Sequence, residues 1–284
     1  MNTNIFPCFW FDGNAPQAAE HYCKIFPNAK ISHQSAMVIM LDFNGQPIML
    51  LNGGSTFKPN PSISMMVMCE TAEEVEKYYN ELAPKGKILM DLGSYPWSEK
   101  YAWISDEYNI SWQFYLLNEK PEQKYVPTLM YIQENNGKCR EAMNLYTSVF
   151  SNSKINGIKE HPEAAGELKG MVAHADFSIN DYLLYAMDGG TNHQFNFTEG
   201  VSLVVMTDDQ QETDMYWNAL TANGGQESMC GWLKDPYGVS WQITPKRLIE
   251  LTNDENSDKA KKVFNAMLKM KKIIIADLET AYNS

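Results

Sequence analysis

The sequence contains no long apolar run and few basic residues, and each shortage excludes a class of protein. No window approaches the ~20 consecutive apolar residues that span a bilayer, and the first residues show no basic stretch before an apolar one, so we expect a cytoplasmic protein without a membrane partner. Lysine and arginine number 23 against 35 aspartates and glutamates, a formal net charge of −12. Because such a surface repels phosphate, nucleic acid is not expected as a partner.

Cysteine is scarce, and nucleotide-binding loops are missing. Five cysteines without CxxC spacing indicate reduced, mostly buried thiols. No glycine-rich turn joins a strand to a helix at the start of a βαβ unit, so the sequence offers no site for S-adenosylmethionine. We therefore expect no cofactor.

The sequence does contain one motif that occurs twice. Residues 231–245 are typical of a hairpin, because Asp235 and Gly238 occupy positions that type I turns favour and the following residues alternate with the period of a strand. The motif also occurs at 102–114, with Asn109 in the place of Gly238. Asparagine is the residue after glycine that best tolerates a left-handed turn position. The repeated motif indicates an internal duplication.

The duplication extends over most of the chain. Each half contains two successive βαβββ patterns, in which an apolar strand precedes an amphipathic helix and three further strands follow. The first half has extra residues between Gly86 and Tyr101, which we assign to a loop. The predicted parts are a first domain at 1–118, a linker at 119–125, a second domain at 126–250 and a helical tail at 251–284.

The tail differs from both halves. Apolar residues with helical spacing lie among lysines, including Lys269, Lys271 and Lys272. One interpretation is a helix that packs one domain against the other. The alternative is a helix on a membrane surface.

Paired βαβββ modules ending in D-P-x-G-x-x-W-Q resemble the vicinal-oxygen-chelate superfamily, which includes glyoxalase I, dioxygenases and bleomycin-binding proteins. Residues 231–245 and 266–272 resemble its PhnB-like branch, which carries the label 3-demethylubiquinone-9 3-methyltransferase. The resemblance implies an α+β fold of tandem domains, each with two modules forming a half-open barrel, plus the C-terminal helix. It places a site on the concave face of each barrel.

In the metal-using relatives, four residues on that face hold a divalent ion. Commonly they are a histidine on the first strand, a glutamate on the fourth, a histidine on the fifth and a glutamate on the eighth. In this sequence the corresponding positions are near Pro7 and Pro127, within 48–52 and 184–188, at Ser64 and Ser202, and at Gln113 and Gln242. Amide and hydroxyl oxygens are weak ligands for transition metals, so no metal site is expected.

The cavity faces should then carry apolar walls with a few polar anchors, as small-molecule pockets do. Trp103 and Trp232 are ambiguous, because a one-residue bulge would change their face. The alternative is that these side chains simply fill a closed barrel core. The predicted ligand-binding residues are Phe9, Phe11, Ser64, Met66, Gln113, Tyr115, Tyr131, Ser202, Met206, Ser240 and Gln242.

The function predicted from these features is metal-independent binding of a small organic molecule. The alternative is a metal-dependent lyase, isomerase or dioxygenase of the same superfamily, so the sequence leaves open whether the protein is an enzyme, and it identifies no catalytic residue. The methyltransferase label is disfavoured by the missing cofactor loop. Since the halves can pair within one chain as a pseudo-dimer, we expect a monomer.

Overall fold

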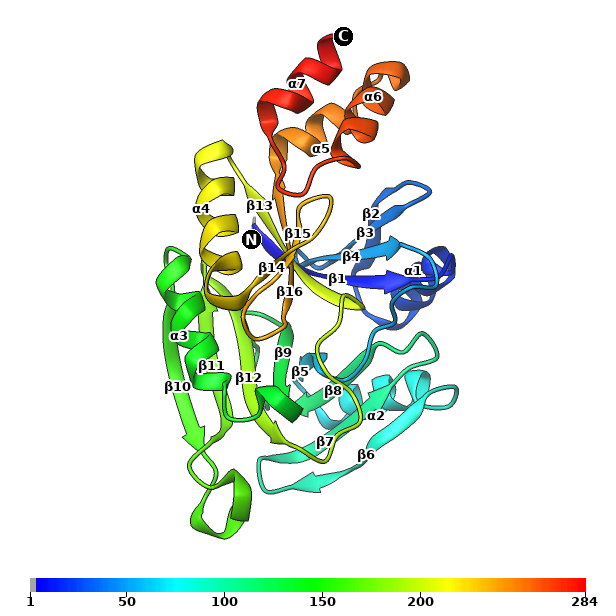
Figure 1. Cartoon of the computed structure of the whole chain (residues 1–284). Helices are drawn as coiled ribbons and strands as arrows, with labels where there is room; N and C mark the ends of the chain where they lie inside the picture. Colours follow the sequence, from blue (N-terminus) through cyan, green and yellow to red (C-terminus); the bar gives the residue numbers. More distant parts are fainter. Residues whose placement is uncertain (1–3) are drawn as a thin grey trace. The chain divides into compact units, whose positions relative to one another are not determined.

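A computed structural model describes residues 4–284 (Figure 1). In it the chain follows the repeated βαβββ order of elements. The strands are β1 Ile5–Phe11, β2 Ala29–Gln34, β3 Val38–Phe43, β4 Pro47–Asn52, β5 Ile63–Cys69, β6 Lys87–Tyr95, β7 Ser98–Ser105, β8 Ser111–Leu116, β9 Tyr125–Ile132, β10 Lys154–Glu160, β11 Val172–Ile179, β12 Tyr182–Gly190, β13 Val201–Thr207, β14 Gln226–Glu227, β15 Trp232–Lys234 and β16 Ser240–Pro245. The helices are α1 Ala15–Ile25, α2 Ala72–Leu82, α3 Cys139–Val149, α4 Gln210–Thr221, α5 Lys246–Thr252, α6 Ser257–Met267 and α7 Ile275–Asn283.

Four modules share one internal topology. Modules 1 to 4 begin at β1, β5, β9 and β13, and in each the first strand pairs in parallel with the last, while the other pairings are antiparallel. The described strands form two mixed eight-stranded sheets, which confirms the predicted α+β fold of tandem modules. The parallel pair requires a crossover, and the module's helix supplies it.

One sheet lies entirely within residues 7–201 and joins module 2 to module 3. Its strand order is β10-β11-β12-β9-β5-β8-β7-β6, and its middle is the antiparallel pair of β5 and β9. Modules 1 and 2 therefore contribute their strands to different sheets. Segment 119–125 connects strands of the same sheet.

Compactness divides the chain into two units. One contains Pro7–Val201, and the other contains Asn4–Phe6 with Ser202–Ser284. The boundaries 1–118 and 126–250 describe the sequence repeat, and they remain a prediction as domain boundaries.

A buried carboxylate organises the first copy of the repeated hairpin. Asp106 Oδ1 accepts the backbone N–H groups of Tyr108 and Ile110, and Oδ2 accepts from Trp112 Nε1 at 2.8 Å and from Tyr22 Oη at 2.7 Å. Burial raises the pKa of Asp106 to about 6, against these hydrogen bonds, which lower it. At neutral pH the group is thus an ionised acceptor for four donors.

Asp235 holds the second hairpin in the same way. Its Oδ1 accepts from the backbone of Tyr237 and Val239, and its Oδ2 accepts from Trp241 Nε1 at 2.9 Å. Asn109 and Gly238 both adopt positive φ, at 66° and 86°. The predicted turn chemistry is confirmed in both copies.

Modules 1 and 2 pack through their helices. Tyr22 lies on α1, so its bond to Asp106 joins the two modules. Phe26, at the end of α1, lies 5.0 Å from Trp112 and 4.9 Å from Tyr78 of α2, measured between ring centroids. Aromatic rings therefore fill the space between the two modules within this unit.

The extra residues of the first half are not a loop, contrary to the prediction. They lengthen the hairpin of β6 and β7, which pairs Lys87 with Ser105 and continues to Tyr95 and Ser98. The matching hairpin in module 4 has only the short strands β14 and β15. A hairpin can extend outward beyond its sheet, and this one does so with several register shifts between Ile88 and Tyr95, which accommodate the extra residues.

The starts of the helices are satisfied in different ways. Thr71 caps α2 by accepting the N–H of Glu74 at 3.3 Å. Asn14, in contrast, makes no side-chain cap on α1. The N–H of Ala15 is instead accepted by Asn52 Oδ1 at 3.1 Å, so the last strand of the module satisfies the start of its helix.

The tail forms three helices that pack on one another through Leu248, Leu251, Val263, Ile273 and Leu278 (Figure 1). The carbonyl groups of Met270 and Lys271 accept the N–H groups of Cys230 and Gly231 at 2.7 Å, which attaches the tail to module 4.

Basic residues of the tail are ion-paired within its own unit. Lys271 pairs with Glu227 and Lys272 with Asp214. These contacts disfavour the membrane-surface interpretation, which needs the lysines to face lipid. Within residues 4–284, no helix has the length and apolarity to cross a bilayer.

Replacing Asp106 by asparagine should lower the free energy of unfolding by roughly 2–3 kcal/mol. The new NH₂ group would face Trp112 Nε1–H, which cannot accept, so buried donors would lose their partner. Urea denaturation measures the change, with Glu107→Gln as the control, because Glu107 makes only long surface ion pairs. Equal stability of both variants and the wild type would contradict this role for Asp106.

Candidate functional site

The pairing of β5 with its neighbours decides which side chains lie together. Met66 pairs with Gln113 in β8, and Ser64 pairs with Thr128 in β9. Paired residues point to the same side of a sheet. We call this side of the module 2–3 sheet, opposite α2 and α3, the open face.

A chain of neutral hydrogen bonds crosses the open face. Gln113 Nε2 donates to Ser64 Oγ at 2.5 Å, and Tyr101 Oη donates to Gln113 Oε1 at 2.6 Å. Beside it, Trp103 Nε1 donates to Ser111 Oγ at 2.8 Å. These polar groups therefore satisfy one another.

Both ambiguous tryptophans lie on the side of the glutamines. Trp103 pairs with Gln113 and Trp232 pairs with Gln242, so no bulge reverses either strand at this point.

Aromatic and methionine side chains surround the polar chain in two clusters. Burial raises the pKa of Tyr101, the hydroxyl that donates to Gln113. One cluster is built on Tyr101, Trp103, Met130 and Ile132, and the other on Met66, Met68 and Val126, with Tyr115 packing against both.

Several residues of this face were missed by the sequence prediction. On β12, Tyr185 and Met187 pair with Thr128 and Met130, so they belong to the same face. His174 of β11 packs on Tyr185, with ring centroids 4.9 Å apart, and burial lowers its pKa. The histidine is therefore neutral near pH 7.

Three predicted site residues lie on the wrong side of their strands. Phe9 pairs with Leu50 and Leu50 with Ile39. Phe43, on the same side of β3 as Ile39, packs on Phe26 at the end of α1, so this side faces the helix. Phe11 alternates with Phe9 and lies on that same side, where it contacts Tyr108.

Tyr131 is buried, and its hydroxyl lies 3.0 Å from that of Tyr146 on α3. Strands β1 and β9 are apolar on both sides, so alternation alone could not fix which side faces a helix. The signal that could have corrected the assignment is the polar residue Thr128, which pairs with Ser64.

The other predicted residues are brought together in two groups. Ser64, Met66, Gln113 and Tyr115 share the open face. In module 4, Ser202 pairs with Ser240 and Met206 with Thr244, so Ser202, Ser240, Gln242 and Met206 share one side of β13 and β16. Gln242 Nε2 donates to Ser202 Oγ at 3.0 Å, as Gln113 does to Ser64. We call this side the Gln242 face.

The donor set does not fit a transition metal. On the open face, the residues at or next to the positions that the family resemblance assigns to metal ligands are Thr128, Tyr185 or Met187, Ser64 and Gln113. None supplies a carboxylate or imidazole, and the amide of Gln113 is already bonded at both ends. Within residues 4–284, no three histidine, cysteine, aspartate or glutamate side chains gather as a metal site.

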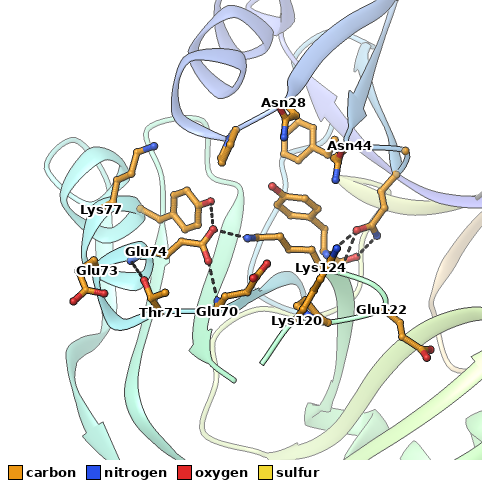
Figure 2. Close-up of a pocket in the computed structure, with 17 residues that line it drawn as sticks. Asn28, Asn44, Glu70, Thr71, Glu73, Glu74, Lys77, Lys120, Glu122 and Lys124 are labelled. Carbon is orange, nitrogen blue, oxygen red and sulfur yellow. Dashed lines mark hydrogen bonds and ion pairs between the residues drawn. The ribbon is translucent and has the colours of Figure 1, made fainter. Parts of the chain in front are cut away.

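A cavity of about 730 Å³ lies elsewhere, where the β3–β4 turn, the start of α2 and segment 120–125 meet. Figure 2 shows Glu74 facing Lys124 in it, while Glu73 and Glu122 point away. Tyr78 Oη also donates to Glu74, and Gln46 holds the backbone at residues 124–125. Since the polar side chains in this cavity are bonded to one another or to the backbone, we interpret it as a structural junction between modules and not as a binding site.

Three comparisons place the chain among known proteins. The family model of 3-demethylubiquinone-9 3-methyltransferase matches residues 3–115 and 123–244. A putative 3-demethylubiquinone-9 3-methyltransferase, PhnB protein, from Bacillus cereus is 32% identical over 39% of this chain and 97% of its own, with a TM-score of 0.36.

A longer structural match is glyoxalase I from Zea mays, which covers 83% of this chain and 89% of its own, at 13% identity and a TM-score of 0.58. That likeness shows the fold alone. The search of curated proteins found no match. Because the family model covers both halves, the chain belongs to the 3-demethylubiquinone-9 3-methyltransferase (PhnB-like) family.

Proposed function

We propose that this protein binds a small, uncharged organic molecule without the help of a metal. The observation that carries the proposal is the repeated neutral pair, Gln113 with Ser64 and Gln242 with Ser202. Each pair occupies strand positions at which metal-using relatives place ionisable ligands. An amide and a hydroxyl can donate and accept at once, which suits a neutral polar group.

The surroundings favour the same kind of ligand. On the open face, Met66, Met68 and Tyr115 lie beside the polar chain, and methionine adapts its shape to irregular apolar guests. A few polar anchors within apolar walls are the usual composition of sites for small organic molecules.

Metal-independent binding is better supported than either methyl transfer or metal-dependent catalysis. The family's label refers to methyl transfer, but the sequence has no glycine-rich strand-to-helix turn that could hold S-adenosylmethionine. A metal-dependent lyase, isomerase or dioxygenase would need carboxylate or imidazole ligands where the chain has glutamine and serine. We therefore assign no catalytic residue.

Metal content separates binding from metal-dependent catalysis. Protein purified without chelators or affinity metals should contain less than about 0.1 equivalent of zinc, nickel, iron or manganese, because neutral oxygens hold these ions weakly. Elemental analysis by mass spectrometry measures it. One equivalent or more, removed by a chelator and restored on addition, would favour the metal-dependent alternative.

Gln242→Leu tests the polar anchor. A thermal-shift screen of small alcohols, phenols and amides supplies the compound, and calorimetry should show its affinity for the variant reduced by roughly 1–3 kcal/mol, the cost of an unsatisfied buried partner. The melting temperature should change little. Unchanged affinity together with a melting temperature several degrees lower would make Gln242 a purely structural residue.

The assembly proposal is a monomer, because four modules in one chain can complete both sheets internally. Light scattering of the purified chain should give a mass near 32.4 kDa. A stable mass of about twice that value across dilution would show that a further interface exists between copies.

A further inference from the structure

The two repeated Gln–Ser faces are not equivalent, and a buried hydroxyl reveals the difference. Ser240 is 1% exposed, and its Oγ has no hydrogen-bond partner among the described residues. Buried polar groups in proteins are nearly always bonded, so an exception calls for an explanation. One explanation is a bound small molecule that supplies the missing hydrogen bond to Ser240 Oγ.

The matching hydroxyl in module 2 is satisfied by the protein itself. Ser111 begins β8 as Ser240 begins β16, and it accepts from Trp103 Nε1 at 2.8 Å. Its neighbour Gln113 is bonded at both ends, by Ser64 and Tyr101. The open face therefore offers no vacant strong acceptor at this point.

The matching amide in module 4 is bonded at one end only. Gln242 donates to Ser202, and no described residue donates to its Oε1. Two residues before Trp232 the chain has Cys230, where module 2 has Tyr101 two residues before Trp103. Cys230 lies before β15 with φ of 60°, and its N–H donates to Met270 in the tail. The hydroxyl of Tyr101, which donates to Gln113 Oε1, thus has no counterpart beside Gln242.

We propose that the two faces have diverged, and that Ser240 and Gln242 bind the polar end of the small molecule while Gln113 and Ser111 serve the fold. This inference rests on the proposed binding function and assigns it to the Gln242 face. Gln242 Oε1 accepts a hydrogen bond from the ligand, and Ser240 Oγ donates to it or accepts from it.

The same residues restrict the class of ligand. Strands β13 and β16 carry no charged residue, while Lys234 of the neighbouring strand β15 pairs with Ser240 and lies on this same side. Val204 pairs with Gln242, and Met206 lies further along the same side. The ligand class follows from Gln242 Oε1, which requires an O–H or N–H donor, so we assign an alcohol, a phenol or a primary or secondary amide with an apolar body.

Two fluorinated probes test the assignment on the full chain. 4-Fluorophenol has an apolar ring and one O–H donor, and fluorobenzene has the ring alone, so ¹⁹F NMR titration measures the contribution of the donor. Ser240→Ala is compared with its matched control Ser111→Ala. We expect Ser240→Ala to weaken 4-fluorophenol about tenfold and fluorobenzene less than twofold. Ser111→Ala should change both less than twofold.

Thermal stability gives an independent readout. Ser240→Ala should leave the melting temperature unchanged or raise it, because it removes an unsatisfied hydroxyl, whereas Ser111→Ala should lower it by leaving Trp103 Nε1–H without its acceptor. A lowered melting temperature for Ser240→Ala would show that the hydroxyl already has a partner, such as ordered water, and would overturn the inference.

The remaining outcomes separate this inference from the binding function. If wild-type protein binds 4-fluorophenol and both alanine variants weaken it equally, or neither does, the assignment to the Gln242 face is wrong while small-molecule binding stands. If wild-type protein binds neither these probes nor any compound of the thermal-shift screen, the proposed function fails and this inference with it.

Discussion

The fold depends on a buried carboxylate that gathers four hydrogen-bond donors. Asp106 fixes its own turn through two backbone N–H groups, orients Trp112 of the last strand and holds Tyr22 of another module's helix. A neutral acceptor of the same shape could not serve all four, since an amide offers only one oxygen. That turn joins β7 to β8, and the antiparallel pairing of the two strands places Gln113 opposite Trp103.

Much of this architecture could be predicted from local chemistry. The turns were predicted from Asp106 and Asn109 and from their counterparts Asp235 and Gly238, because few residues tolerate those positions. The amphipathic helices were predicted from the helical spacing of apolar residues. Ser64 and Gln113 share one side of the sheet, and their role in binding stays a prediction. In those strands a polar residue marks the face that a helix does not cover.

The rest required information that a single strand does not contain. Phe9 and Tyr131 were assigned to the wrong side because β1 and β9 are apolar on both faces, so only pairing with a neighbour fixes them. Likewise, nothing local states that β5 joins β9. Whether a serine hydroxyl finds a partner, as Ser111 does in Trp103 and Ser240 does not among the described residues, is a tertiary property.

The sheet shared by modules 2 and 3 has a consequence for how the two halves can change. A half-length protein with this pairing would complete such a sheet only with a second copy, and symmetry would then force every substitution to appear in both sites at once. In one continuous chain, position 111 and position 240 mutate separately. One site can keep its polar groups hydrogen-bonded within the protein, while the equivalent groups of the other site lose those partners. Fusion of two identical halves into one chain therefore permits the two sites to diverge.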